Sequence, residues 1–246
     1  IDLDDWMKIY CEARYGGYPD AMEEAWKLFR KTAYSSLYSY PRFTWQTVIP
    51  DQRRISKIDL SDDYLQAIRL YASCADELKS SELYRNDLIE FVSYYVAAKA
   101  ENFYKQALKD DLENRVLAAQ RNLQQTVDLL MDVDRLLASH PLYRLEEWVE
   151  LARNSGTTLQ EKDAYEANAK RLITSWGGIQ EDYAARFWSG LIKDYYIPRI
   201  QLYFTKDRDK IREWEEQWIT SPWSNSTTPF DDPVKAALNL IEKTNK

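Results

Sequence analysis

The feature that most constrains this 246-residue chain is a long interval without helix breakers. No glycine lies between Gly17 and Gly156, and no proline lies between Pro50 and Pro141. Glycine and proline destabilise a helix interior more than other residues do, and all-β folds need many of them in their turns. Because the whole chain holds only 6 glycines and 8 prolines, we predict an all-α fold.

Caps and apolar spacings predict about nine to eleven helices in a single domain, with no repeat of fixed period. Gly16 and Gly17 supply a left-handed stop for the first helix, and Ser61 is an N-cap for a later one. Residues 35–57, which are rich in aromatic side chains, and residues 221–229 are expected to be loops. The expected helices with both ends defined are 3–14, 83–108, 112–137, 141–154, 158–176 and 181–196, the last followed by a break or kink at Pro198. Further helices are expected to begin at about residues 20, 61 and 233. One or two more are expected between Pro198 and residue 218.

A heptad-like apolar stripe runs from Leu112 through Val116 to Leu137, which predicts a helix that packs along its whole length. Asp134 falls on this stripe. Since a buried carboxylate without a partner is costly, Asp134 is expected to find a partner or to sit at a frayed end.

Composition and charge exclude several classes of protein. The net charge is −7, from 33 basic and 40 acidic residues, so the basic face of a nucleic-acid binder is not expected. No apolar run approaches the roughly 18–20 residues of a membrane span. Because the first residue is Ile1 and not Met, we expect a processed piece or an excised domain of a larger protein.

Cofactor and metal sites are not predicted either. One histidine and two cysteines are too few for a zinc cluster or a disulfide framework. The sequence leaves open whether Cys11 and Cys74 pair or stay reduced. Because no GxGxxG or GxxxxGK[ST] motif is present, we predict no nucleotide cradle and no cofactor.

Catalytic groups are also hard to find. His140, the one histidine, precedes Pro141 and is expected to be a surface or capping residue. Adjacent acids such as Glu215 and Glu216 point about 100° apart on a helix, so they are expected to lie on solvated faces or to match a helix dipole. We therefore predict no catalytic residue within this chain.

The aromatic residues are unusually many, with 9 Trp, 18 Tyr and 7 Phe. Most are expected to fill the core. An unusual group lies between Trp176 and Tyr183, where two glycines separate one helix from the next. Such a turn either covers a core or offers its rings to a ligand, and the face of a sugar ring packs well on Trp or Tyr.

An ordered string of motifs around this turn resembles a known family. It comprises Trp176-Gly177, Asp182-Tyr183-Ala184, Arg186, Trp188-Ser189-Gly190-Leu191, Asp194-Tyr195-Tyr196 and Pro198-Arg199. Upstream motifs agree, among them Ala13-Arg14-Tyr15-Gly16, Ala25-Trp26-Lys27-Leu28, Arg85-Asn86-Asp87-Leu88 and Glu166-Ala167-Asn168. Together they resemble the C-terminal helical domain of the α-N-acetylglucosaminidases, glycoside hydrolase family 89.

The resemblance implies that residues 1–246 are the helical C-terminal domain of a larger, retaining glycosidase that removes terminal α-linked N-acetylglucosamine. In the family, two glutamates of a preceding barrel are the catalytic groups, so this chain alone is expected to be inactive. The helical domain packs on that barrel and closes one wall of the pocket. The parent protein is expected to act outside the cytoplasm, either in the lysosome or as a secreted, periplasmic or surface protein.

The resemblance also names the substrate-binding residues. Trp176 and Tyr183 are expected to form part of the pocket wall, with Ile179 or Gln180 as a third contact. Asp182 is expected to cap a helix rather than touch the ligand, and Arg14 and Arg199 are expected to be structural or interface residues. The alternatives are a stand-alone helical scaffolding domain and, less favoured, an independent carbohydrate-binding module.

Overall fold

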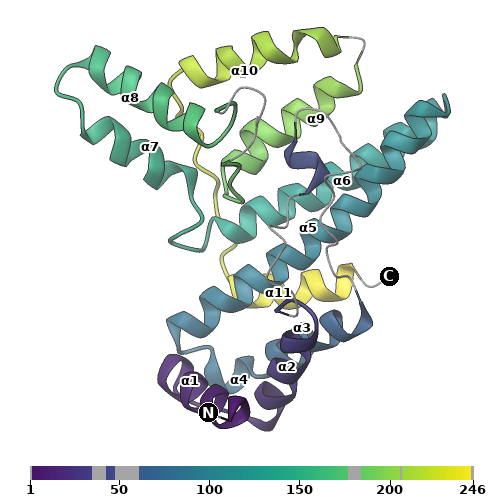
Figure 1. Ribbon diagram of the computed structural model, residues 1–246, viewed down its shortest axis with the longest axis vertical. Helices are drawn as coiled ribbons and strands as arrows, with labels where there is room; N and C mark the ends of the chain where they lie inside the picture. The colour runs from purple at the N-terminus through teal and green to yellow at the C-terminus, as the bar shows by residue number, and fades with distance from the viewer. Residues whose placement is uncertain (1, 35–42, 48–60, 177–183, 206, 245–246) are drawn as a thin grey trace. The chain divides into compact units, whose positions relative to one another are not determined.

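The expected all-α fold is confirmed by a computed structural model, which describes residues 2–34, 43–47, 61–176, 184–205 and 207–244. These residues form eleven α-helices and no β-strand (Figure 1). None of the helices among them is long and apolar enough to cross a membrane. The helices are α1 (Leu3–Tyr15), α2 (Asp20–Lys31), α3 (Asp62–Ser73), α4 (Ala75–Leu78), α5 (Glu82–Leu112), α6 (Val116–Leu137), α7 (Leu145–Asn154), α8 (Leu159–Leu172), α9 (Ile197–Tyr203), α10 (Ile211–Thr220) and α11 (Pro233–Lys243).

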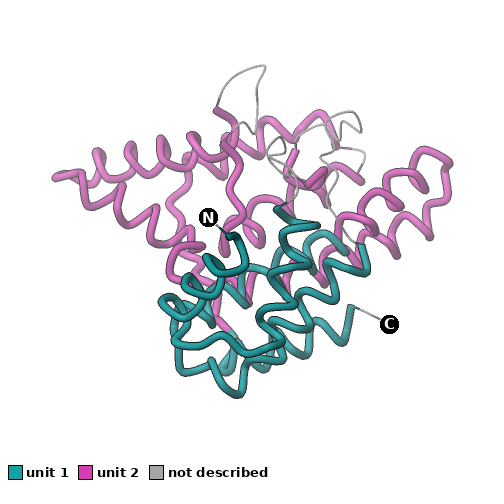
Figure 2. Tube along the Cα trace, turned by 60° about the horizontal axis from the view of Figure 1, so that its bottom comes forward, with its two compact units in different colours: residues 1–41, 56–99, 230–246 teal, residues 42–55, 100–229 magenta. Residues whose placement is uncertain are grey.

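Contacts group the chain into two compact units, shown in teal and magenta in Figure 2. Unit 1 comprises residues 1–41, 56–99 and 230–246, and unit 2 comprises residues 42–55 and 100–229. The long helix α5 contributes its first part to unit 1 and its last part to unit 2. Each unit is described here by itself.

Unit 1 is built around an aromatic core. The rings of Tyr71 and Tyr84 stack at 4.9 Å, and those of Phe29 and Phe91 lie 4.6 Å apart. The predicted stop of α1 is confirmed, since Gly16 has a φ of +84° and donates its N–H to the Glu12 carbonyl. A left-handed residue of this kind satisfies carbonyls that a helix end leaves unpaired.

Arg14 and Asp87 join α1 to α5 within unit 1. The Arg14 guanidinium donates to both carboxylate oxygens of Asp87 at 2.7 and 2.6 Å, and the Tyr15 hydroxyl donates to the same carboxylate at 2.6 Å. Arg14 therefore has the structural role that was one of its two expected roles.

Unit 2 places α7 and α8 side by side as a helical hairpin, with α10 packed on α8 (Figure 1). The N-terminus of α8, where a helix was predicted to begin, is capped by Thr158. The Thr158 hydroxyl accepts from the Glu161 N–H, and the Glu161 carboxylate accepts in return from the Thr158 N–H at 3.0 Å. This reciprocal pair satisfies two donors that the first turn would otherwise leave open.

Three helix expectations are wrong. The stripe from Leu112 is not continuous, because α5 ends at Leu112, Asn114 takes a φ of +58°, and Leu112 and Val116 are 75% and 61% exposed. The helix expected from Pro141 begins only at Leu145. Residues 184–189 are not helical, although a helix was expected through them. There, Ser189 pairs with Arg144 in an isolated parallel bridge, so backbone groups of two loops satisfy one another instead.

Pro198 does mark an irregularity, as predicted. Residues Ile192–Tyr196 form a wider π-helical turn immediately before α9, and Pro198 lies in the first turn of α9. A proline lacks the N–H that a regular helix needs, so a local change of winding next to it is expected.

Candidate functional site

Trp176 lies four residues beyond the end of α8, and its side chain is 46% exposed. Its backbone N–H donates to the Arg171 carbonyl at 3.0 Å, and the nearby Thr174 hydroxyl donates to the Lys170 carbonyl at 2.7 Å. These bonds fix the backbone that carries Trp176 to the last turn of α8. The ring is partly exposed and is not buried in the core of unit 2.

The other predicted contacts, Tyr183, Gln180 and Ile179, lie outside the described residues, as does Asp182. The chain on the far side of that interval is held at Arg186. The Arg186 carbonyl accepts from the Tyr196 hydroxyl at 3.0 Å and from Nε2 of Gln46 at 3.4 Å. The described residues at both edges of residues 177–183 are thus tied to unit 2.

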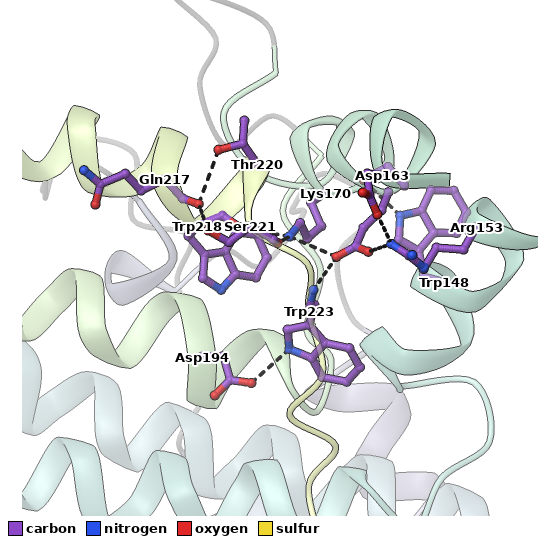
Figure 3. A network of polar contacts seen from close by, with 12 residues as sticks. Trp148, Arg153, Asp163, Lys170, Asp194, Gln217, Trp218, Thr220, Ser221 and Trp223 are labelled. Carbon is purple, nitrogen blue, oxygen red and sulfur yellow. Dashed lines mark hydrogen bonds and ion pairs between the residues drawn. The ribbon is translucent and has the colours of Figure 1, made fainter. Parts of the chain in front are cut away.

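A buried charged network lies beneath this end of α8. Glu166 and Lys170, one helical turn apart, are only 1% exposed each. The Glu166 carboxylate accepts from Lys170 Nζ at 3.1 Å, from Arg153 at 2.6 Å and from the Trp223 N–H at 2.5 Å. Figure 3 shows Lys170, Arg153 and Trp223 converging from three different segments of the chain.

Lys170 connects α8 to α10 through carbonyl groups. Its ammonium donates to the Trp218 carbonyl at 2.9 Å and to the Ser221 carbonyl, and it lies 4.9 Å from the centre of the Trp218 ring. Burial lowers the pKa of Lys170, while the neighbouring Glu166 opposes that change. The network therefore holds the C-terminal half of α8, which lies just before Trp176 in the chain, against α10.

Trp223 extends the network toward the loop of residues 184–190. Its indole N–H donates to Asp194 at 3.0 Å, and burial raises the pKa of that carboxyl. The same ring covers Gly190, where an added Cβ would lie 3.0 Å from the ring. With a φ of +82°, Gly190 needs both the backbone freedom and the small size of glycine.

Asp134 has hydrogen-bond partners, which confirms the first of the two outcomes expected for it. It is fully buried and accepts from the Gly190 N–H at 2.8 Å, the Lys193 N–H at 3.0 Å and the Thr227 hydroxyl at 2.6 Å. Burial nevertheless raises its pKa. Asp134 therefore joins α6 to the segment from Gly190 to Lys193 and to Thr227, all within unit 2.

A second buried pair corrects the prediction for adjacent acids. Glu215 is 2% exposed rather than solvated, and its carboxylate accepts from Arg199 at 2.9 Å and from the Tyr195 hydroxyl at 2.8 Å. Arg199 also donates to the Gln46 carbonyl at 2.8 Å. Arg199 is therefore structural, whereas Glu216 behaves as predicted and pairs with Arg171 at the surface.

His140 is buried, with 4% exposure, rather than on the surface, and it caps neither of the flanking helices α6 and α7. Its Nδ1 accepts from the Leu142 N–H at 3.1 Å in the turn that leads to α7. Cys11 and Cys74 are both buried and reduced, which settles the alternative that the sequence left open.

Within the described part of the chain, no group of histidine, cysteine and acidic side chains is placed to hold a metal ion. The buried carboxylates of these residues each accept hydrogen bonds from structural donors. They are Asp87, Glu101, Asp110, Asp134, Glu166 and Glu215. A glycosidase needs one acid kept protonated and a second carboxylate facing it across the sugar, and these carboxylates are committed to holding helices together.

Sequence reasoning did not identify the Glu166–Lys170 network as part of the site. The available signal was the spacing of a glutamate four residues before a lysine, which usually marks a solvent-exposed pair. The sequence motif around Glu166 was noticed, but nothing in it indicated that both charges are buried.

Residues 6–243 match the family model of the Alpha-N-acetylglucosaminidase (NAGLU) C-terminal domain. Human alpha-N-acetylglucosaminidase is 28% identical over 228 residues, which is 86% of this chain and 30% of the human protein.

Solved structures of a family 89 glycoside hydrolase from Clostridium perfringens share the fold. The form in complex with PUGNAc has a TM-score of 0.84 at 22% identity, covering 98% of this chain and 31% of that one. A doubly substituted form in complex with its substrate GlcNAc-alpha-1,4-galactose has a TM-score of 0.85, with the same identity and coverage. The present chain thus spans about a third of the length of these relatives.

Proposed function

Since this chain belongs to the family of alpha-N-acetylglucosaminidase C-terminal domains, we propose that residues 1–246 complete the substrate pocket of a larger glycoside hydrolase. The parent enzyme removes terminal α-linked N-acetylglucosamine by a retaining mechanism, and it acts outside the cytoplasm. Its catalytic glutamates lie in a barrel that is not part of this chain. The family match over nearly the whole chain is the observation that carries the proposal.

The chain alone is expected to be inactive. Its buried carboxylates, such as Glu166 and Glu215, are engaged by structural donors at 2.5–2.9 Å. Both are buried within unit 2 and bonded to structural groups, which supports a non-catalytic role. The domain's contribution is therefore to bind and orient the sugar rather than to supply the reacting groups.

Trp176 is proposed to form a flat apolar wall against the N-acetylglucosamine ring or its acetamido methyl group. Its exposure of 46% supports this role, because exposed large apolar side chains often mark interaction sites. The last turn of α8 is anchored by Lys170 and Glu166, so the ring needs little reorganisation before it binds.

Tyr183 is proposed to donate or accept a hydrogen bond with the sugar, and Ile179 or Gln180 to provide the third contact. A neutral hydrogen bond of this kind contributes about 0.5–1.5 kcal/mol, or about 2- to 12-fold in rate. Tyr183→Phe should lower kcat/KM by that factor, since it removes only the hydroxyl.

The test is hydrolysis of an aryl α-N-acetylglucosaminide by the intact parent protein. Trp176→Ala should lower kcat/KM about 10- to 100-fold, equal to about 1.4–2.7 kcal/mol. Tyr165→Ala is the matched control, because Tyr165 is an aromatic residue of α8, the helix that precedes Trp176, and has a similar exposure of 44%.

Each outcome separates the possibilities. Equal activity of the Trp176→Ala and wild-type enzymes would mean that Trp176 is only a packing residue. An intact parent without glycosidase activity, but with a defined protein partner, would favour the scaffolding alternative. Glycan binding by this domain without the barrel, measured by calorimetry, would favour a carbohydrate-binding module.

A further inference from the structure

Unit 1 carries an apolar patch whose outer side chains remain exposed. The patch consists of Trp6, Ile9, Tyr10, Ala13 and Arg14 of α1 together with Leu83 of α5. These residues line a hollow of about 340 Å³. Trp6, Ile9 and Leu83 are 47%, 65% and 42% exposed. An exposed cluster of large apolar side chains usually marks an interaction site.

The pattern of α1 explains why the patch is left over. The buried side of the helix carries Met7, Cys11 and Tyr15, which face the core of unit 1. Trp6 and Ile9 lie on an adjoining side at 100° per residue. A helix that is apolar over more than one face normally packs against two partners, and unit 1 provides one of them.

The patch is also rigid before anything binds to it. The ring of Trp6 stacks on Tyr10 at 5.4 Å with an angle of 15°, and the Arg14 guanidinium lies 5.8 Å from the centre of the Tyr10 ring. Arg14 is held in turn by its two bonds to Asp87. Trp, Tyr and Arg carry a large share of the binding energy at protein interfaces, and side chains that are already ordered lose little entropy on binding.

We propose that this patch is where the domain docks onto the part of its own polypeptide that precedes it, an inference that rests on the proposed function. The matched family is a C-terminal domain, and this chain covers 30% of the human relative. Polypeptide attached ahead of Leu3 is tethered directly beside the patch. Such a tether makes docking intramolecular, which raises the effective concentration of the partner surface to the millimolar range.

The charges around the patch indicate the chemistry of the partner surface. Asp5, Glu12 and Glu82 are exposed and adjoin patch residues in sequence, as does Lys8, and Arg14 lies within the patch itself. The matching surface is therefore an apolar protrusion that fills the hollow, with charges of both signs at its edge. Complementary charge of this kind fixes the register of an interface more than its affinity.

Photo-crosslinking of the intact parent protein tests the proposal. With Ile9 replaced by benzoylphenylalanine, crosslinks mapped by mass spectrometry should join position 9 to residues that precede Leu3 in the same polypeptide. The control position is Leu117 of α6, which is 78% exposed and lies outside the patch. Crosslinks from position 9 to a second copy, or no intramolecular crosslinks, would overturn the proposal.

A stability measurement provides the second readout. Ile9→Asp should lower the Tm of the intact parent by several degrees, whereas Leu117→Asp should leave it unchanged. Since Ile9 is 65% exposed in unit 1, its replacement does not disturb the core of that unit. Equal Tm values for the two variants would count against the docking site.

The docking proposal and the proposed function fail in different ways. If the parent hydrolyses the aryl α-N-acetylglucosaminide but position 9 gives no intramolecular crosslink, the docking site is wrong and the glycosidase assignment stands. If crosslinks map as expected but the parent shows no hydrolysis, the docking site stands and the assignment is wrong.

Discussion

Replacement of Gly190 by alanine should destabilise the protein through two separable effects. Gly190 has a φ of +82°, and an added Cβ would lie 3.0 Å from Cζ2 of Trp223 and 3.2 Å from Cβ of Leu145. The Trp223 ring cannot move away freely, because its indole N–H is bonded to Asp194 and its backbone N–H to Glu166.

The expected magnitude is the sum of a backbone cost and a packing cost. A left-handed conformation costs a residue with a Cβ about 1–2 kcal/mol. Forcing an extra carbon into a packed site costs about 1–3 kcal/mol more. Gly190→Ala should therefore lower the free energy of unfolding by about 2–5 kcal/mol.

Gly16→Ala is the matched control, since Gly16 has almost the same φ of +84° but no atom within 4 Å of its added Cβ. It should cost only the backbone contribution of about 1–2 kcal/mol. The difference between the two variants isolates the contact with Trp223.

The assay is urea unfolding followed by far-UV circular dichroism and tryptophan fluorescence. If the two units unfold in separate transitions, each variant is compared within its own transition. A loss for Gly190→Ala that is no larger than the loss for Gly16→Ala would refute the reasoning, because the indole ring would then be free to yield.

Three further predictions concern buried and capping groups. Lys170→Met should cost about 3–5 kcal/mol in urea unfolding, because it leaves the buried Glu166 short of a partner; a loss near zero would mean that Arg153 suffices. Hydrogen bonds from neighbouring threonines lower the pKa of Glu161 from 4.5 to about 2. Its contribution to stability is thus complete above about 4.5 and is lost as the pH falls toward 2, so Glu161→Gln should flatten the acid limb of a stability–pH curve; an unchanged limb would contradict this. Burial raises the pKa of Cys11 to about 12 and of Cys74 to about 11, so a thiol reagent at mildly alkaline pH should modify both only after denaturation, and rapid modification of the native protein would contradict their burial.

Much of the helical framework was predictable because helix ends depend on interactions within one turn. Gly16 terminates and Ser61 caps a helix as expected, and Thr158 and Asp232 cap helices whose starts were predicted. The hydrogen bonds that they make reach only three or four residues along the chain, so the local sequence contains the information. The all-α fold follows from the same reasoning, applied to the long interval without breakers.

The errors fall where distant segments decide the outcome. Residues 184–189 were expected to be helical, but the Ser189 N–H donates to the Tyr143 carbonyl, 46 positions away in sequence, and the Ser189 carbonyl accepts from the Leu145 N–H. Val116 was expected to be buried on a continuous stripe, but α5 ends at Leu112 and the chain turns at Asn114 before α6 begins. Such long-range pairings and breaks leave no periodic signal.

The candidate site divides in the same way. The motif string singled out Trp176, and the structure added that its ring is 46% exposed, whereas Trp45 is fully buried. Composition and local pattern do not distinguish these two tryptophans. Exposure is set by what the rest of the chain places over each ring.

Two pairs of charges show most directly what each level of structure determines. Glu23 and Lys27 of α2, like Glu166 and Lys170 of α8, are a glutamate and a lysine four residues apart on a helix. The sequence alone determined that each pair forms, because the spacing places both side chains on one face. The side chains of the first pair are 43% and 34% exposed, and those of the second are 2% and 1% exposed. Only the tertiary structure decided which pair became a buried clamp, because desolvation depends on the packing of α10 and Trp223 against α8.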